Sequence, residues 1–213
     1  MSSQAIRYLQ HENVRLKTEI QAQQEQIKNL THYVDALADL YKESQRIMKE
    51  EDPLDALDQL LLEIVQVCGS KDGSVLALDR DTHELVFTLV HGELRQQLPG
   101  HRIKSDVGVA GWAIENGQNV IVNNPHQDWR FSLSVDQEFA FLTRSILCVP
   151  IHCGKKIMGV TELINKDPSG FTDADLVILT VFAHIAAMVL AETDDCPIDE
   201  MPDESDNIVT QLL

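Results

Sequence analysis

The first forty residues carry apolar side chains in two interleaved series, each with a spacing of seven residues. One series is Ile6, Ile20, Ile27 and Val34, with Asn13 in one of its slots, and the other is Leu9, Leu16, Leu30 and Leu37. β-Branched residues at one core position with leucine at the other favour two parallel strands, and a single buried asparagine sets their register. The pattern predicts a parallel homodimeric coiled coil over residues 1–50. The alternative is a single surface helix that packs on its own domain.

The residues that follow alternate between helical and extended patterns. Asp52 and Pro53 are typical of a helix start, as N-cap and first helical residue. Beyond that helix, the pattern predicts two hairpins (74–78 with 84–90, 145–152 with 157–164), a loop (94–106), a short helix (109–116), a strand (120–122), a helical turn (137–142) and a last helix from 173. This order predicts an α+β fold for residues 52–192, with an antiparallel sheet and helices on one face.

The last predicted helix is apolar on nearly all sides between Leu176 and Ala191. A helix of this kind must be covered all round. It is shorter than the roughly 20 residues that a bilayer crossing needs, and acidic residues flank it. We therefore expect a buried helix and no membrane partner.

Charge is distributed unevenly along the chain. The formal net charge is −17, no Lys or Arg follows Lys166, and eight of the 34 acidic residues lie between Glu192 and Asp206. Residues 193–213 are therefore predicted to form an acidic, disordered tail. Phosphate backbones require a basic surface, so nucleic acid is not an expected partner.

Cysteine usage and the start of the chain indicate a cytoplasmic protein. The first ten residues lack the basic and apolar regions of a secretory signal, and the four scattered cysteines are expected to be free thiols in a reducing compartment. On a strand, Cys148 and His152 would stand about 13 Å apart, and Cys153 would point to the other face. We therefore expect no metal site. The chain also lacks the common catalytic motifs, which predicts a protein that is not an enzyme.

Several blocks of residues resemble a GAF domain. They are Gly108-Val109-Ala110-Gly111-Trp112-Ala113 with Asn116-Gly117, Asp128-Trp129-Arg130-Phe131, residues 143–151, Gly159-Val160, Asn165-Lys166, Phe171 and Asp175. The resemblance covers roughly residues 52–192. It is strongest to the GAF domains of cyclic-nucleotide phosphodiesterases and adenylyl cyclases, and to those of bacterial signalling proteins.

The resemblance implies a six-stranded antiparallel sheet with a small-molecule pocket under a lid on one face and the first and last helices on the other. Cyclic-nucleotide-binding members share an Asn-Lys, Phe, Asp-Glu signature. Asn165, Lys166, Phe171 and Asp175 match it, whereas Leu176 replaces the final Glu. In those members the Lys and Asp are held to form an ion pair that steadies the lid. The alternative is a pair between a strand end and a helix start that is common to many GAF domains that bind nothing.

Five residues are candidates for contact with a ligand in that pocket: Asp128, Arg130, Phe131, Thr143 and Arg144. An Arg side chain offers a fork to a phosphate or carboxylate, a Phe ring a stacking face and a Thr side chain a hydroxyl. The alternatives are structural: Arg130 would bind Asp128 or a loop carbonyl, and Arg144 would pair with an acid of the tail.

These features together predict a non-catalytic, dimeric GAF sensor or regulatory protein. It would bind a small molecule, for which the resemblance suggests a cyclic nucleotide, and would relay its state to an unidentified output protein. The alternative is a GAF scaffold that mediates protein–protein interaction without a ligand, with Phe139 or Phe141 filling the pocket.

Overall fold

The computed structural model describes residues 11–24, 27, 28, 31, 34, 38, 42 and 52–191 of the chain, which divides into two units, Met1–Asp39 and Leu40–Leu213. The described residues before 52 are helical. Among them, the predicted coil residues Leu16, Ile20, Ile27 and Val34 are exposed by 47–63%. Ile6, Leu9, Leu30 and Leu37 lie outside the described residues, as does the tail at 193–213, so the parallel coil and the disordered tail stay predictions.

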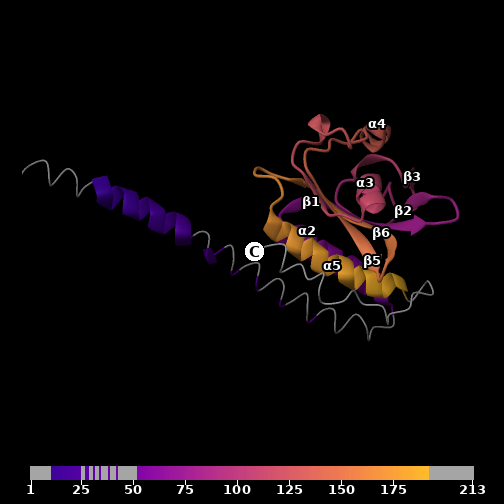
Figure 1. Cartoon of the computed structure of the whole chain (residues 1–213), viewed down its shortest axis with the longest axis horizontal. Coiled ribbons are helices and arrows are strands. Elements are labelled where there is room, and N and C mark those ends of the chain that lie inside the picture. Colours follow the sequence, from indigo (N-terminus) through magenta and orange to yellow (C-terminus); the bar gives the residue numbers. More distant parts are fainter. Residues whose placement is uncertain are drawn as a thin grey trace, which may run out of the picture. The chain divides into compact units, whose positions relative to one another are not determined.

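The second unit contains a six-stranded antiparallel sheet (Figure 1). Its strands are β1 (Ser70–Asp79), β2 (Glu84–His91), β3 (Arg102–Lys104), β4 (Val120–Val122), β5 (Ile146–Cys153) and β6 (Lys156–Lys166). Its helices are α2 (Pro53–Val67), α3 (Gly108–Asn116), α4 (Ser134–Phe139) and α5 (Asp173–Ala191), with a 3-10 turn, η1, at Pro125–Gln127. The strand order is β3-β2-β1-β6-β5-β4, so the first and last long strands, β1 and β6, pair at the centre. The α+β prediction is confirmed.

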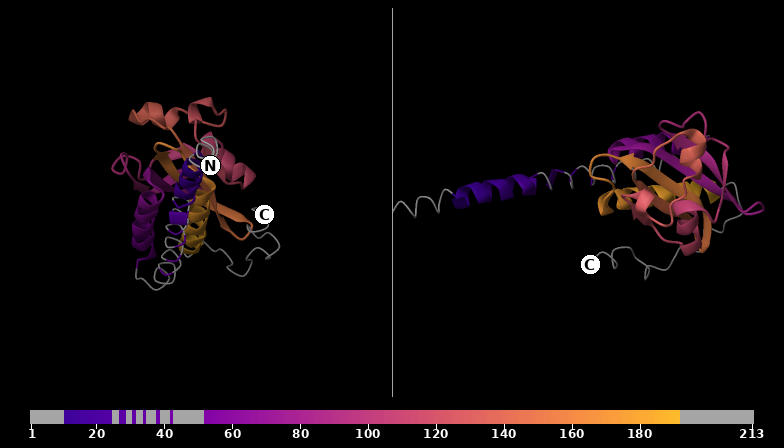
Figure 2. Two further views of the ribbon diagram at one scale, coloured as in Figure 1. Left: turned by 90° about the vertical axis from the view of Figure 1, so that its left-hand side faces the viewer. Right: turned by 90° about the horizontal axis from the view of Figure 1, so that it is seen from above.

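Helices cover both faces of this sheet. α2 and α5 contact each other and pack on β1 and β5 (Figures 1 and 2). α3 packs on the opposite face, where Val109 and Ala113 join a core with Leu76 and Cys148. The prediction of helices on one face is therefore incomplete. In β5, residues 146–151 are all buried instead of alternating with exposed ones, which is the pattern of a strand covered on both sides.

The helix boundaries follow the local signals in the sequence. The Asp52 carboxylate accepts hydrogen bonds from the backbone N–H groups of Leu54 and Asp55 at 3.2 and 3.3 Å, and thereby caps α2. Gly117 ends α3 in the left-handed conformation, with φ of 62°. Both elements therefore begin or end where capping chemistry predicts.

Two elements differ from the prediction. The segment predicted as a loop contains β3, which pairs with residues 84–86 of β2. Arg102 of β3 lies 2.8 Å from both Asp79 and Glu84, so ion pairs between side chains hold this short edge strand. The predicted helical turn is α4, which begins three residues earlier, at Ser134.

α5 is long and apolar enough to cross a membrane by length and composition, but 61% of that segment is buried within the protein. The prediction of a buried helix is therefore confirmed. Among the cysteines, Cys68 and Cys148 are buried and free. Cys153 is disulfide-bonded, so the expectation of free thiols is wrong for this residue, which lies only half-buried at the end of β5.

The pairing of β1 with β6 depends on the absence of a side chain at Gly159. A Cβ atom there would overlap the Leu76 carbonyl oxygen of the neighbouring strand. We expect Gly159→Ala to lower the free energy of unfolding by about 2–3 kcal/mol, because the backbone must shift to relieve the overlap. Gly100→Ala is the control, since Gly100 has a φ of 82° but no atom within 4 Å of its would-be Cβ; it should cost about 1–2 kcal/mol from backbone strain alone. Equal losses in urea denaturation would contradict this account of the strand pairing.

Candidate functional site

A cavity of about 100 Å³ lies on the α3 side of the sheet. A single water needs about 10–15 Å³ by this measure, so the space admits a small organic molecule. Its walls are largely apolar, with Phe87 and Val90 from β2, Val109 and Ala110 from α3, and Phe141 after α4. Phe139 is not a lining residue; its ring stands edge-on to the His101 ring, with centroids 5.0 Å apart.

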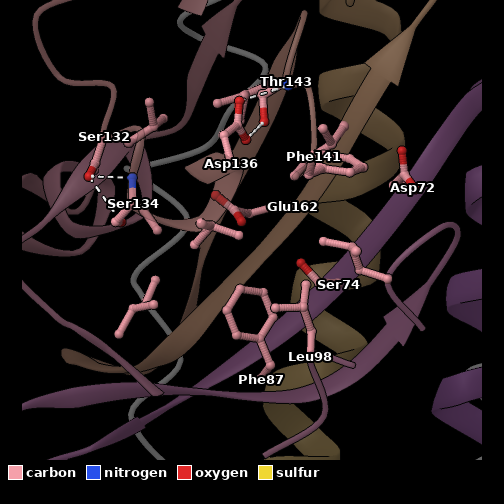
Figure 3. A pocket seen from close by; sticks show the side chains of 18 of the residues that line it. Asp72, Ser74, Phe87, Leu98, Ser132, Ser134, Asp136, Phe141, Thr143 and Glu162 are labelled. Atoms are coloured by element: carbon pink, nitrogen blue, oxygen red, sulfur yellow. Dashed lines mark hydrogen bonds between the residues drawn. The ribbon is translucent and has the colours of Figure 1, made fainter. Parts of the chain in front are cut away.

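Two polar side chains from adjacent central strands reach the cavity through this apolar lining. Ser74 of β1 and Glu162 of β6 are direct cross-strand neighbours, and both are buried, with 4% and 8% of their surface exposed. The Ser74 hydroxyl is the one buried side-chain polar atom without a hydrogen-bond partner in the part of the chain that the structure describes. Figure 3 shows both groups among the side chains that line the cavity.

Ser74 and Glu162 form the floor of the cavity, and burial determines the protonation state of the Glu162 carboxyl. Removal from water raises the pKa of Glu162 to about 7, because an apolar environment disfavours the charged carboxylate. Its cross-strand neighbour on β5 is Cys148, whose thiol also has its pKa raised well above the usual value by burial and by the adjacent Glu162. Cys148 therefore remains a neutral thiol, and Glu162 changes charge near neutral pH.

Two further carboxyl groups line the cavity with partners of their own. Asp136 of α4 accepts hydrogen bonds from the Thr143 backbone N–H at 3.0 Å and from the Thr143 hydroxyl at 2.6 Å (Figure 3). Asp72 of β1 accepts one from the Glu93 backbone N–H at 2.8 Å, and burial raises the pKa of Asp72 as well. These bonds fix α4 and the segment after β2 at the edges of the cavity.

Of the five predicted ligand residues, the structure brings two to the cavity, Phe131 and Thr143. Asp128 and Arg130 bind each other instead, with the Arg130 Nε and one terminal nitrogen at 2.9 and 2.6 Å from the two carboxylate oxygens. This bidentate pair lowers the pKa of Asp128 to about 2. The guanidinium also lies over the Trp112 ring, 4.7 Å from its centroid.

Arg144, the fifth predicted ligand residue, lies outside the cavity lining. Its guanidinium contacts Asp167 at 3.1 Å, and the acids of the tail lie outside the described residues. Its backbone N–H donates to the Asn165 side chain at 2.7 Å, and the Asn165 amide in turn donates to the Leu142 carbonyl at 3.0 Å. Asn165, which adopts a φ of 64°, thus links the end of β6 to the segment that leads into β5.

The signature residues Lys166 and Asp175 form the ion pair that the resemblance implies. The Lys166 ammonium lies 2.7 and 2.6 Å from the two Asp175 carboxylate oxygens, and Asp175 is fully buried. The Thr172 backbone N–H and hydroxyl donate to the same carboxylate at 2.8 Å. Phe171 is also buried, and its backbone is bound by the Asn123 side chain. These residues anchor the start of α5 to the end of β6.

Sequence reasoning missed Ser74, Glu162 and Asp136. Glu162 carried a signal, since it is the single acid inside the otherwise apolar stretch Met158–Ile164, and a buried strand rarely holds an unpaired acid. Ser74 and Asp136 carried none, because Ser and Asp are common at strand ends and in helix first turns. Within the described residues, no group of three or more His, Cys, Asp or Glu side chains is arranged to hold a metal ion.

Comparisons with known proteins give relatives for this fold and site. The chain is 30% identical over 123 residues to the "Probable 3',5'-cyclic phosphodiesterase pde-5" of Caenorhabditis elegans, which covers 57% of this chain and 16% of that protein. It is 33% identical over 87 residues to the "Dual 3',5'-cyclic-AMP and -GMP phosphodiesterase 11A" of Takifugu rubripes, covering 39% of this chain and 10% of that protein. The chain thus spans a small part of these relatives.

Among solved structures, the GAF domain of a phosphoenolpyruvate-protein phosphotransferase from Acinetobacter superposes with a TM-score of 0.64 at 22% identity, over 75% of this chain and 95% of that one. This likeness concerns the fold. The sequence profile of the GAF domain matches residues 52–190, the whole of the sheet and the helices around it. The chain therefore belongs to the GAF domain family.

Proposed function

We propose that this chain is a non-catalytic GAF sensor that binds a small organic molecule in the cavity and relays its occupancy through α2 and α5. The observation that carries the proposal is the unpaired Ser74 hydroxyl, buried at the floor of that cavity. An unsatisfied buried polar group costs about 1–3 kcal/mol. Such a cost is expected where a bound ligand supplies the missing hydrogen bond.

Two connections join the cavity to the helices on the far side of the sheet. His91 lines the cavity, and its Nε2 lies 2.9 Å from both the backbone carbonyl and a carboxylate oxygen of Asp58 in α2. On β6, Glu162 is followed four residues later by Lys166, which binds Asp175 of α5. A ligand that displaces the His91 side chain would therefore act on α2, and one that displaces the Glu162 side chain would act on α5.

The proposal extends to the identity of the ligand and to the protein that receives the signal. The relatives' names suggest a cyclic nucleotide as one ligand to test. The predicted coil would hold two copies in parallel, and a cytoplasmic partner protein would receive the signal. A chain that binds no small molecule would instead be a scaffold for protein–protein interaction.

Ligand binding is tested by thermal unfolding of the full chain against cyclic nucleotides and a panel of small metabolites. A ligand at a hundredfold excess over its Kd should stabilise the protein by about 2.7 kcal/mol. Ala110→Leu, which adds bulk at the cavity wall, should remove this response. Ala174→Leu, half-buried at the start of α5 and outside the cavity, should keep it. A flat response to the whole panel would leave the scaffold alternative.

Ser74→Ala should raise the free energy of unfolding by about 1 kcal/mol while weakening ligand binding, because it removes a hydroxyl that lacks a partner in the free protein. Ser145→Ala is the matched control. Ser145 is equally buried, but its hydroxyl accepts a hydrogen bond from the Lys166 backbone N–H at 3.0 Å, so its loss should cost about 1 kcal/mol. If urea denaturation finds both variants destabilised alike, the Ser74 hydroxyl is not a reserved ligand contact.

Replacing Leu16 and Ile20 together by Glu should halve the mass measured by light scattering, since both side chains are exposed in the single helix and belong to the predicted seam. Gln21→Glu, outside the seam, should leave the mass unchanged. A wild-type chain that is already monomeric would rule out the proposed dimer.

A further inference from the structure

Acidic side chains around the cavity are not balanced by Lys or Arg. Three carboxyl groups, on Asp72, Asp136 and Glu162, come from three different elements, and no Lys or Arg is among the residues that line it. An anion moved into such a site loses its hydration without gaining a cation. The cavity therefore disfavours a negatively charged ligand group at its floor.

Three cations of the surrounding loops and strands are engaged elsewhere. Arg130 binds Asp128, Arg144 binds Asp167, and Lys166 binds Asp175. To reach a ligand in the cavity, each would have to leave its own acid unpaired. The nearby basic side chains therefore do not offset the acidic lining.

Glu162 differs from the other two lining acids in its partners. Asp136 and Asp72 accept hydrogen bonds from N–H or O–H groups of the protein, whereas the one side-chain partner that the structure assigns to the Glu162 carboxyl is the weakly donating thiol of Cys148. The unpaired Ser74 hydroxyl lies on the adjacent strand. This floor can accept hydrogen bonds and compensate a positive charge.

The walls suit the same kind of ligand. Phe87, Phe131 and Phe141 line the cavity from three separate segments, and aromatic faces attract cations when water is excluded. We propose that the cavity binds a compact organic cation, such as a protonated amine or amidine, with its charge at Glu162 and its carbon framework among these rings. This inference rests on the proposed function of the cavity as the ligand site.

The proposal implies that binding depends on pH. The pKa of Glu162 is raised to about 7 in the free protein by burial, and a bound cation would lower it, so binding releases a proton and strengthens as pH rises through 7. The other titratable groups that face the cavity are Asp72 on β1, whose pKa is raised by burial, His91 on β2 and Asp136 on α4, with Cys148 beside Glu162 on β5. Asp72 and Asp136 have N–H or O–H donors from the protein, so the ionised Glu162 carboxylate gains most from a bound cation.

The test uses three molecules of one shape and different charge, namely benzamidine, benzamide and benzoate, titrated into the full chain by calorimetry at pH 6 and pH 8. We expect benzamidine to bind at least about tenfold more tightly than either of the others at pH 8. Its affinity should rise about tenfold between the two pH values, because the ionised fraction of a group with pKa near 7 rises by that factor. At pH 7, binding should release about half a proton, measured in buffers of different ionisation enthalpy.

Glu162→Gln should remove both the preference for the cation and its pH dependence, whereas Glu115→Gln, an exposed acid on α3, should change neither. Proton release by the wild-type chain tests the same point if the Glu162 variant fails to fold. Tighter binding of benzoate or of a cyclic nucleotide, sensitive to Ala110→Leu, would overturn the cation proposal and leave the sensor function intact. The absence of binding by any of these molecules and by the metabolite panel would overturn both.

Discussion

The central sheet of this GAF domain is buried on both faces, so a charged side chain on the sheet or against it can find partners only inside the protein. α2 and α5 exclude water from one face, and α3 with α4 from the other. Two buried acids meet this constraint differently. Asp175 accepts four hydrogen bonds, two from the Lys166 ammonium and two from Thr172. Glu162 has a thiol beside it, and its pKa rises to about 7.

The same contrast separates the frame of the site from its floor. The frame consists of paired charges, Asp128 with Arg130 and Arg144 with Asp167, and these pairs hold loops in place. The floor consists of unbalanced or unpaired groups, Glu162 and Ser74. Ion pairs have their partners without a ligand. An unsatisfied buried group, in contrast, is stabilised when a bound ligand supplies the hydrogen bond that it lacks. The proposed ligand contacts therefore lie at the floor.

The sheet also connects this floor to the helices behind it. β6 carries Glu162 toward the cavity and Lys166 toward the start of α5, and β2 ends at His91, which contacts both the cavity and Asp58 of α2. The strands are hydrogen-bonded along their length, so the proposed relay would run from the floor through β2 and β6 to the two helices. This connection is the physical basis of the proposed sensor function.

The sequence by itself determined the α+β class, the GAF resemblance, the cap at Asp52, the stop at Gly117 and the hairpin of residues 145–152 with 157–164, because these depend on local propensity and spacing. It also indicated the Lys166–Asp175 pair through the family signature.

The sequence did not determine β3, whose pairing depends on Arg102 reaching two distant acids, nor the second helical layer. Arg130 and Arg144 were predicted from their chemistry to meet a ligand, but where an arginine points is decided by the acids that fold beside it. Ser74 and Glu162 became a site only when β1 and β6, some ninety residues apart in the chain, paired at the centre of the sheet, because burial and cross-strand proximity are properties of the tertiary structure.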